Sequence, residues 1–93
     1  MRIDMEKELT TLDGKVIGKM KQFCVESLLA VFEDERNLMG QEKLNRFILA
    51  KKIYEGEGEI EIPIEDISLL KKLVGKGYGA LIVGQAWEIL EGK

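Results

Sequence analysis

The chain has 93 residues, of which 45% are hydrophobic and 33% are charged, and its formal net charge is −3. This length allows one hydrophobic core but not two, and the composition is typical of a folded chain. The sequence contains no histidine and a single cysteine, which disfavours cysteine–histidine catalysis and excludes an internal disulfide. We expect one domain spanning residues 1–93, which is not an enzyme and has no catalytic residue, metal site or cofactor.

The charge and the N-terminal sequence also restrict partners and location. A net negative charge makes direct nucleic-acid binding unlikely, because proteins that follow a phosphate backbone concentrate Lys and Arg on one face. The N-terminus lacks the apolar segment of a signal peptide, and no stretch approaches the roughly 18 uninterrupted apolar residues of a membrane-spanning helix. We therefore expect a cytoplasmic protein that has no contact with a membrane.

The N-terminal region predicts a β-hairpin. Asp13-Gly14 lies between two β-prone stretches within residues 9–17, and this dipeptide favours a tight hairpin turn. Residues 2–5 also alternate between apolar and polar side chains, which indicates that the first strand begins there.

Residues 19–32 have the periodicity of an amphipathic helix. Its apolar arc consists of Met20, Cys24, Val25, Leu28, Leu29, Val31 and Phe32. Phe23 lies off this arc, so we expect the hairpin or a partner to cover it. Cys24 lies within the arc, and we interpret it as a small buried hydrophobic residue, not as a reactive thiol.

Residues 41–54 predict a second helix that is apolar on two sides. One side carries a stripe of Leu44, Phe47, Ile48 and Tyr54, and the other carries Leu49, Ala50 and Ile53. A helix with apolar residues on two sides is usually central. We expect this helix to be the most buried one of the domain.

An acidic segment follows at residues 55–66, with six carboxylates and no basic residue. Within it, the alternation of Ile60, Ile62 and Ile64 predicts a short strand with one acidic face, and Pro63 places that strand at an edge or an end. Two interpretations remain open. The acidic edge docks on a basic partner through Glu57, Glu59 and Glu61, or its charges keep an exposed strand from pairing with other chains.

Two further helices are predicted at residues 65–74 and 80–90. The glycine-rich sequence of residues 75–79 separates them, because its glycines are expected to end the first helix. The predicted fold is α+β and predominantly helical, with about four short helices, an N-terminal β-hairpin and one additional short strand.

Two motifs suggest ligand chemistry but fail on spacing. Glu55, Glu57 and Glu59 resemble the start of a calcium loop, yet Ile60 occupies the position that requires glycine and Asp66 the position that requires a bidentate Glu. The glycines of residues 75–79 follow a predicted helix, whereas a phosphate-binding loop follows a strand. We expect neither calcium nor nucleotide binding.

The C-terminal region contains candidate interface residues. Tyr78 and Trp87 flank a very apolar run, and exposed aromatic side chains are frequent anchors of protein interfaces. Packing of these residues in the core is the alternative. Leu81 lies on the polar side of the last helix, where Gly84 would permit close approach of a second copy.

The whole chain resembles a family of short, uncharacterised bacteriophage and prophage proteins. The resemblance rests on Leu-Asp-Gly-Lys at 12–15, Leu-Leu-Ala at 28–30, Glu-Lys-Leu-Asn-Arg-Phe-Ile-Leu-Ala-Lys-Lys-Ile at 42–53, Leu-Leu-Lys-Lys-Leu-Val-Gly-Lys-Gly-Tyr at 69–78 and Val-Gly-Gln-Ala-Trp-Glu-Ile-Leu at 83–90. It implies a binding function, either inhibition of a host protein, such as a defence protein, or virion assembly.

These observations give three hypotheses. The first is a non-enzymatic, phage-type protein that binds a protein partner, with the acidic strand and the region from Tyr78 to Trp87 as contacts. The second is a homo-oligomeric structural or virion-assembly factor. The third is a protein that binds a small ligand between subunits.

Overall fold

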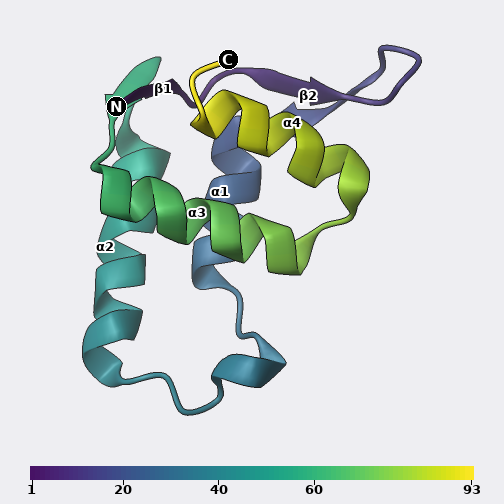
Figure 1. The fold of residues 1–93 in the computed structure, drawn as a ribbon. Helices are drawn as coiled ribbons and strands as arrows, with labels where there is room; N and C mark the ends of the chain where they lie inside the picture. Colours follow the sequence, from purple (N-terminus) through teal and green to yellow (C-terminus); the bar gives the residue numbers. More distant parts are fainter.

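The fold combines four α-helices with two small antiparallel sheets (Figure 1). The computed structural model describes all residues from Met1 to Lys93. In chain order the elements are β1 (Arg2–Asp4), β2 (Glu8–Thr10), β3 (Val16–Lys19), α1 (Met20–Leu29), a 3-10 turn η1 (Glu33–Glu35), α2 (Gly40–Glu55), β4 (Glu59–Glu61), α3 (Ile64–Gly77) and α4 (Ala80–Leu90). The predicted α+β class, with mostly helical content, is confirmed. No helix has the length and the apolar character that crossing a membrane would require.

Strands β2 and β3 form the predicted hairpin, with Leu9 opposite Gly18. The connection contains Gly14 at a φ of 90°, a left-handed conformation that glycine adopts without steric cost. The prediction that residues 2–5 begin the hairpin is wrong. They form the separate strand β1, which pairs with β4 and places Ile3 opposite Ile60. A turn after β1, closed by a hydrogen bond from the Lys7 amide to the Asp4 carbonyl, separates it from β2.

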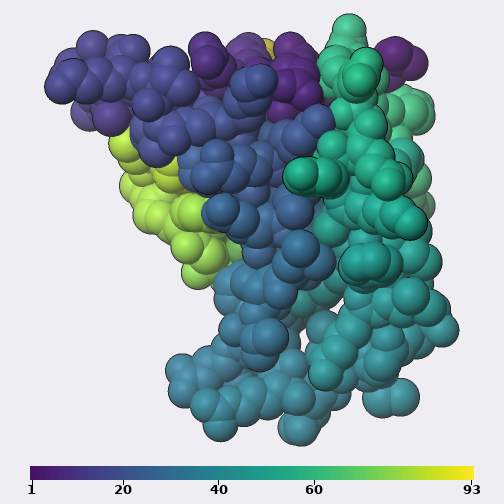
Figure 2. Space-filling model, turned by 180° about the vertical axis from the view of Figure 1, so that it is seen from behind, coloured from purple at the N-terminus to yellow at the C-terminus, as the bar shows by residue number.

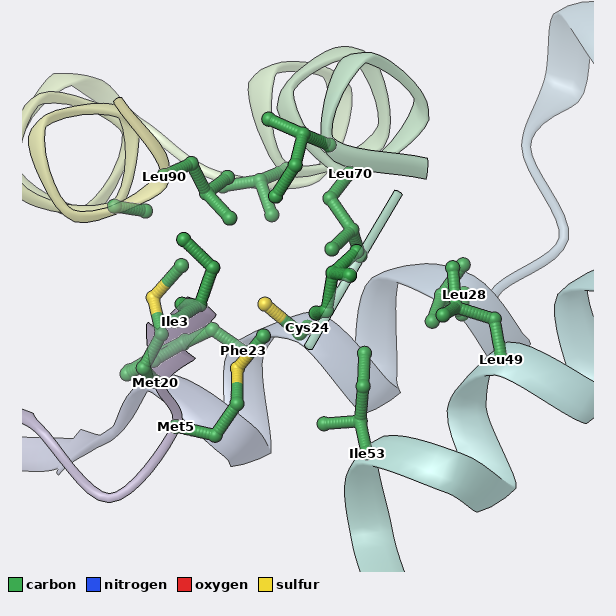
Figure 3. Packing of buried hydrophobic residues seen from close by; sticks show 14 of the residues in the cluster. Ile3, Met5, Met20, Phe23, Cys24, Leu28, Leu49, Ile53, Leu70 and Leu90 are labelled. Carbon is green, nitrogen blue, oxygen red and sulfur yellow. The ribbon is translucent and has the colours of Figure 1, made fainter. Parts of the chain in front are cut away.

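Helix α1, rather than α2, is the centre of the fold. In α1 the buried residues are Met20, Phe23, Cys24, Ser27 and Leu28, whereas the longer α2 buries only Arg46, Leu49, Ala50 and Ile53. Figure 3 shows Cys24 among side chains from β1, α2, α3 and α4. The prediction that the second helix is the most buried is therefore wrong. One side of α2 packs on α1, and no other part of the chain covers the opposite side.

Phe23 is covered by the protein itself. Its ring lies edge-to-face on the ring of Tyr78, with 5.2 Å between centroids and 85° between planes. On its other side, a Cβ added to Gly18 of the hairpin would lie 3.2 Å from the Phe23 ring. The hairpin and the α3–α4 turn thus cover Phe23. Of the two alternatives given by the sequence, the hairpin and a partner, the structure shows the hairpin.

Helix α3 continues through the glycines that were expected to end it. It runs to Gly77, and the Tyr78 amide still donates a hydrogen bond to the Val74 carbonyl. Leu73 and Val74 are fully buried, and their burial outweighs the roughly 1 kcal/mol by which each glycine disfavours a helix. The turn between α3 and α4 is correspondingly short.

Candidate protein-binding surface

The acidic edge predicted from the sequence is exposed. Glu59 and Glu61 lie on β4, and their carboxylates are 4.0 Å from the Arg2 guanidinium and 3.5 Å from the N-terminal ammonium, respectively. Both contacts are solvent-exposed, and such pairs contribute little to stability. Glu57 precedes the strand and is exposed as well. The three carboxylates remain available to a partner, so both interpretations of this edge stay open.

Tyr78, Leu81 and Trp87 do not form one surface, because each faces a different part of the fold. The Tyr78 hydroxyl donates a hydrogen bond of 2.8 Å to Glu26 of α1, and burial raises the pKa of Tyr78. The Trp87 indole N–H donates to the Lys71 carbonyl at 3.1 Å, and the Lys71 ammonium lies 4.6 Å from the ring centroid. The structure therefore gives both aromatic side chains intramolecular roles.

Leu81 lines a shallow groove between α4 and the hairpin, together with Leu12 and Gly84. Gln85 fixes the hairpin beside this groove. Its side chain accepts a hydrogen bond from the Thr10 amide at 2.9 Å and donates one to the Thr10 carbonyl at 2.8 Å. Packing in the core did not explain why Leu81 lies on the polar side of its helix. In the structure 38% of Leu81 is exposed.

A larger apolar surface lies on the outer side of α1 and α2. We call it the α1–α2 face and define it by six exposed residues, which are Leu29, Val31, Leu44, Phe47, Ile48 and Tyr54. Their exposed fractions range from 49% to 90%. Figure 2 shows the two helices side by side on this side of the molecule, with no other element over them. Singly exposed apolar residues are common, but a group of six on two adjacent helices is typical of an interaction surface.

The sequence of α2 explains why this face forms. Arg46, Leu49 and Ile53 lie on one side of the helix and pack inward, and the stripe of Leu44, Phe47, Ile48 and Tyr54 projects from the other side at helical spacing. The sequence showed this stripe, but the pattern alone did not indicate which of the two apolar sides would be buried. The sequence predicted that this helix would be the most buried one, and the structure instead leaves the whole stripe exposed.

The boundary between α1 and α2 is hollowed at both ends. One hollow, of about 230 Å³, lies at the end of α1, and its lining includes Leu29, Val31 and Lys43. The other, of about 320 Å³, lies near the start of α1 and includes Val25 and Tyr54 in its lining. In Figure 2 a gap separates the segment after α1 from α2, next to the first hollow. Three of the six residues that define the face line one of these hollows, and the three from the middle of α2 line neither.

A buried ion pair fixes the segment that lines the first hollow. Arg46 donates two hydrogen bonds to Glu35, of 2.9 and 2.6 Å, and both side chains are about nine-tenths buried. The hydrogen bonds from Arg46 lower the pKa of Glu35 from 4.5 to about 2. Lys76 of α3 adds a contact of 2.9 Å to Asp34. These pairs hold η1 against α2 and α3.

The charges along α2 are mainly positive at the α1–α2 face. Lys43 and Lys51 project from this side of the helix and have no carboxylate within 4.0 Å. Lys52 is bound to the Glu61 carbonyl at 2.5 Å. The face thus combines apolar area with two ammonium groups and one carboxylate, that of Glu55, none of which has an ion-pair partner within 4.0 Å.

Comparison of the chain with protein-family models, curated proteins and solved structures finds no match. The interpretation of this surface therefore depends on its own residues. No three of the Cys, Asp and Glu side chains are arranged to hold a metal ion. Cys24 is buried in the core, and burial raises the pKa of its thiol to about 12, which leaves it unreactive at neutral pH. What the surface offers is apolar contact area and charge.

Proposed function

We propose that this protein is a non-enzymatic binding protein and that the α1–α2 face contacts a protein partner. The observation that carries the proposal is the group of six exposed apolar side chains on α1, α2 and the segment after α1, with a hollow near each end of the helix boundary. Each of the six residues is about half exposed or more, so a partner could bury much of their apolar surface. A monomer that kept this area in water would forgo the free energy of burying it, which amounts to about 25 cal/mol per Å².

The partner in this proposal is a protein of a bacterial host cell. The resemblance to bacteriophage and prophage proteins supports this choice, because small proteins of that kind act on host proteins or in virion assembly. Inhibition of a host defence protein is the activity we favour. The exposed carboxylates of Glu57, Glu59 and Glu61 support a second contact with the same partner, through charge complementarity that increases the association rate.

The alternative is a homo-oligomeric structural or virion-assembly factor that uses the same apolar face. A symmetric contact of α2 with α2 of a second copy would gather Lys43 and Lys51 of both chains along one seam. The like charges of these four lysines oppose association, and Glu55 is the one acid on the same side of α2. This arrangement favours a different partner over a second copy.

Capture from a lysate of the host bacterium tests the proposal with three variants of the tagged protein. Leu44→Glu/Phe47→Glu places two carboxylates within the α1–α2 face and should reduce capture of the partner by about tenfold or more. Leu12→Glu is the matched control, because Leu12 is 97% exposed at the hairpin tip and lies outside the face. Glu57→Lys/Glu59→Lys/Glu61→Lys tests the acidic edge.

The expected result is loss of capture with the α1–α2 variant and retention with Leu12→Glu. If only the acidic-edge variant loses capture of the partner, the acidic edge is the binding surface. If the double variant captures as much partner as the unmodified protein, the α1–α2 face is not the binding surface. Circular dichroism of each variant checks that the fold is retained.

A further inference from the structure

Two hollows lie along the boundary between α1 and α2, beside the exposed residues of the α1–α2 face. We infer that the element of the partner that occupies it is an amphipathic helix with acidic flanks, lying along the boundary between α1 and α2. This inference rests on the function proposed above and adds the conformation and charge of the partner's binding element.

The spacing of the two hollows supports a helical occupant. Along the chain, the second hollow is lined by residues within 19–26 and the first by residues within 28–32, so Gln22 and Leu29, which are seven residues apart on α1, represent their separation. At 1.5 Å per residue these positions are about 10 Å apart, and side chains at i and i+7 of a partner helix have the same separation. One apolar side chain could therefore enter each hollow, and a third at i+3 or i+4 would contact the surface between them.

The backbone of the face also favours a helix over an extended segment. An added strand requires unpaired amide and carbonyl groups at a sheet edge, but beyond their first turns α1 and α2 pair their amides within each helix, and the first amides of α1 bond to the carbonyls of Met5 and Lys7. A third helix can pack beside two others at the usual interaxial distance of about 8–10 Å. It would then cover Leu29, Phe47 and Tyr54 without breaking a hydrogen bond.

The unpaired cations determine the charge of the occupant. Lys43 and Lys51 stand beside the apolar residues of α2 without a carboxylate partner, so glutamates or aspartates on the flanks of a partner helix would pair with them. A second copy of this chain would oppose lysine to lysine there. A bilayer surface is flat and would leave the two hollows empty.

Two fluorescent peptides of about 14 residues test the inference by anisotropy. Both carry leucines at positions i, i+3 and i+7 of an alanine-rich helix, and their flanking residues are all glutamate in one peptide and all lysine in the other. At roughly 50 mM salt, where screening is weak, the glutamate peptide should bind about tenfold or more tighter than the lysine peptide.

Charge reversal on the protein provides the matched control. Lys43→Glu/Lys51→Glu should abolish or invert the preference for the glutamate peptide. Lys7→Glu/Lys15→Glu changes the net charge by the same amount at two lysines without ion pairs outside the face, and it should leave most of the preference intact. Leu44→Glu should weaken binding of both peptides.

Several results would overturn the inference. These are failure of both peptides to bind, equal binding of the two, or a preference that Lys43→Glu/Lys51→Glu leaves unchanged. A dimer in light scattering that Leu44→Glu dissociates would make a second copy the occupant. If the protein co-sediments with phosphatidylglycerol vesicles and Leu44→Glu abolishes this binding, the occupant of the face is a membrane surface.

The lysate experiment separates this inference from the proposed function. If capture depends on Leu44 and Phe47 but the glutamate peptide shows no preference, the binding function stands and the acidic helix is wrong. If capture does not depend on these residues, both proposals fall.

Discussion

Replacing Glu35 with glutamine should destabilise the protein strongly, because it leaves the buried Arg46 guanidinium without its counter-charge. The fall in the pKa of Glu35 from 4.5 to about 2 corresponds to about 3 kcal/mol of stabilisation when the carboxylate is charged. Removal of one partner from a buried pair costs a similar amount, about 3–5 kcal/mol. We expect Glu35→Gln to lower the free energy of unfolding by about 3 kcal/mol at pH 7, a large share of the roughly 5–15 kcal/mol of a typical domain.

The effect of this substitution should depend on pH in a defined direction. The folded-state pKa of Glu35 lies below its unfolded-state value, so its stabilisation is complete above about pH 4.5 and is lost as the pH falls toward 2. Urea unfolding followed by circular dichroism measures the difference between the two proteins. That difference should shrink to less than half between about pH 7 and pH 3. A loss below about 1 kcal/mol at pH 7, or a loss of equal size at both pH values, would refute the reasoning.

Three smaller predictions concern the helices and the core. Gly75→Ala should stabilise the protein by about 0.5–1 kcal/mol, because Gly75 is helical and an added Cβ would lie 3.6 Å from the Trp87 ring; an unchanged or lower thermal midpoint would contradict this. Gly56→Ala should destabilise it, because the added Cβ would lie 2.7 Å from the Ile60 side chain, and a midpoint at or above that of the unmodified protein would count against that packing. Cys24 should resist a thiol reagent in the native state and react only in urea, since its thiol is buried and its pKa is about 12; rapid native labelling would show that the core opens.

The positions of the helices could be predicted because each has a local pattern. The periodicity of residues 19–32, 41–54 and 80–90 located three of them to within a few residues, and Asp13-Gly14 located the hairpin. The end of α3 was missed because burial of Leu73 and Val74 is a tertiary effect that overrides the local preference of glycine.

The candidate site could be predicted only in part. The stripe from Leu44 to Tyr54 was visible in the sequence, but a helix with two apolar sides does not indicate which side the rest of the chain will cover. The burial of Arg46 could not be predicted either, because a charged residue is expected at the surface. Arg46 is buried only because Glu35 lies opposite it. Both features require knowledge of which elements pack together, which local patterns do not contain.

The pairing of β1 with β4 has a consequence for the order in which the protein can fold. Ile3 lies opposite Ile60, so a ribosome must synthesise most of the chain before the first strand has a partner. Contacts between residues this distant in sequence form late, because a long loop must close first. During synthesis, α1 and α2 can pair while Ile3 and Met5 still lack the strand and helices that later bury them. Completion of the core should therefore coincide with the emergence of residues 59–90, and the nascent chain should stay sensitive to proteases until then.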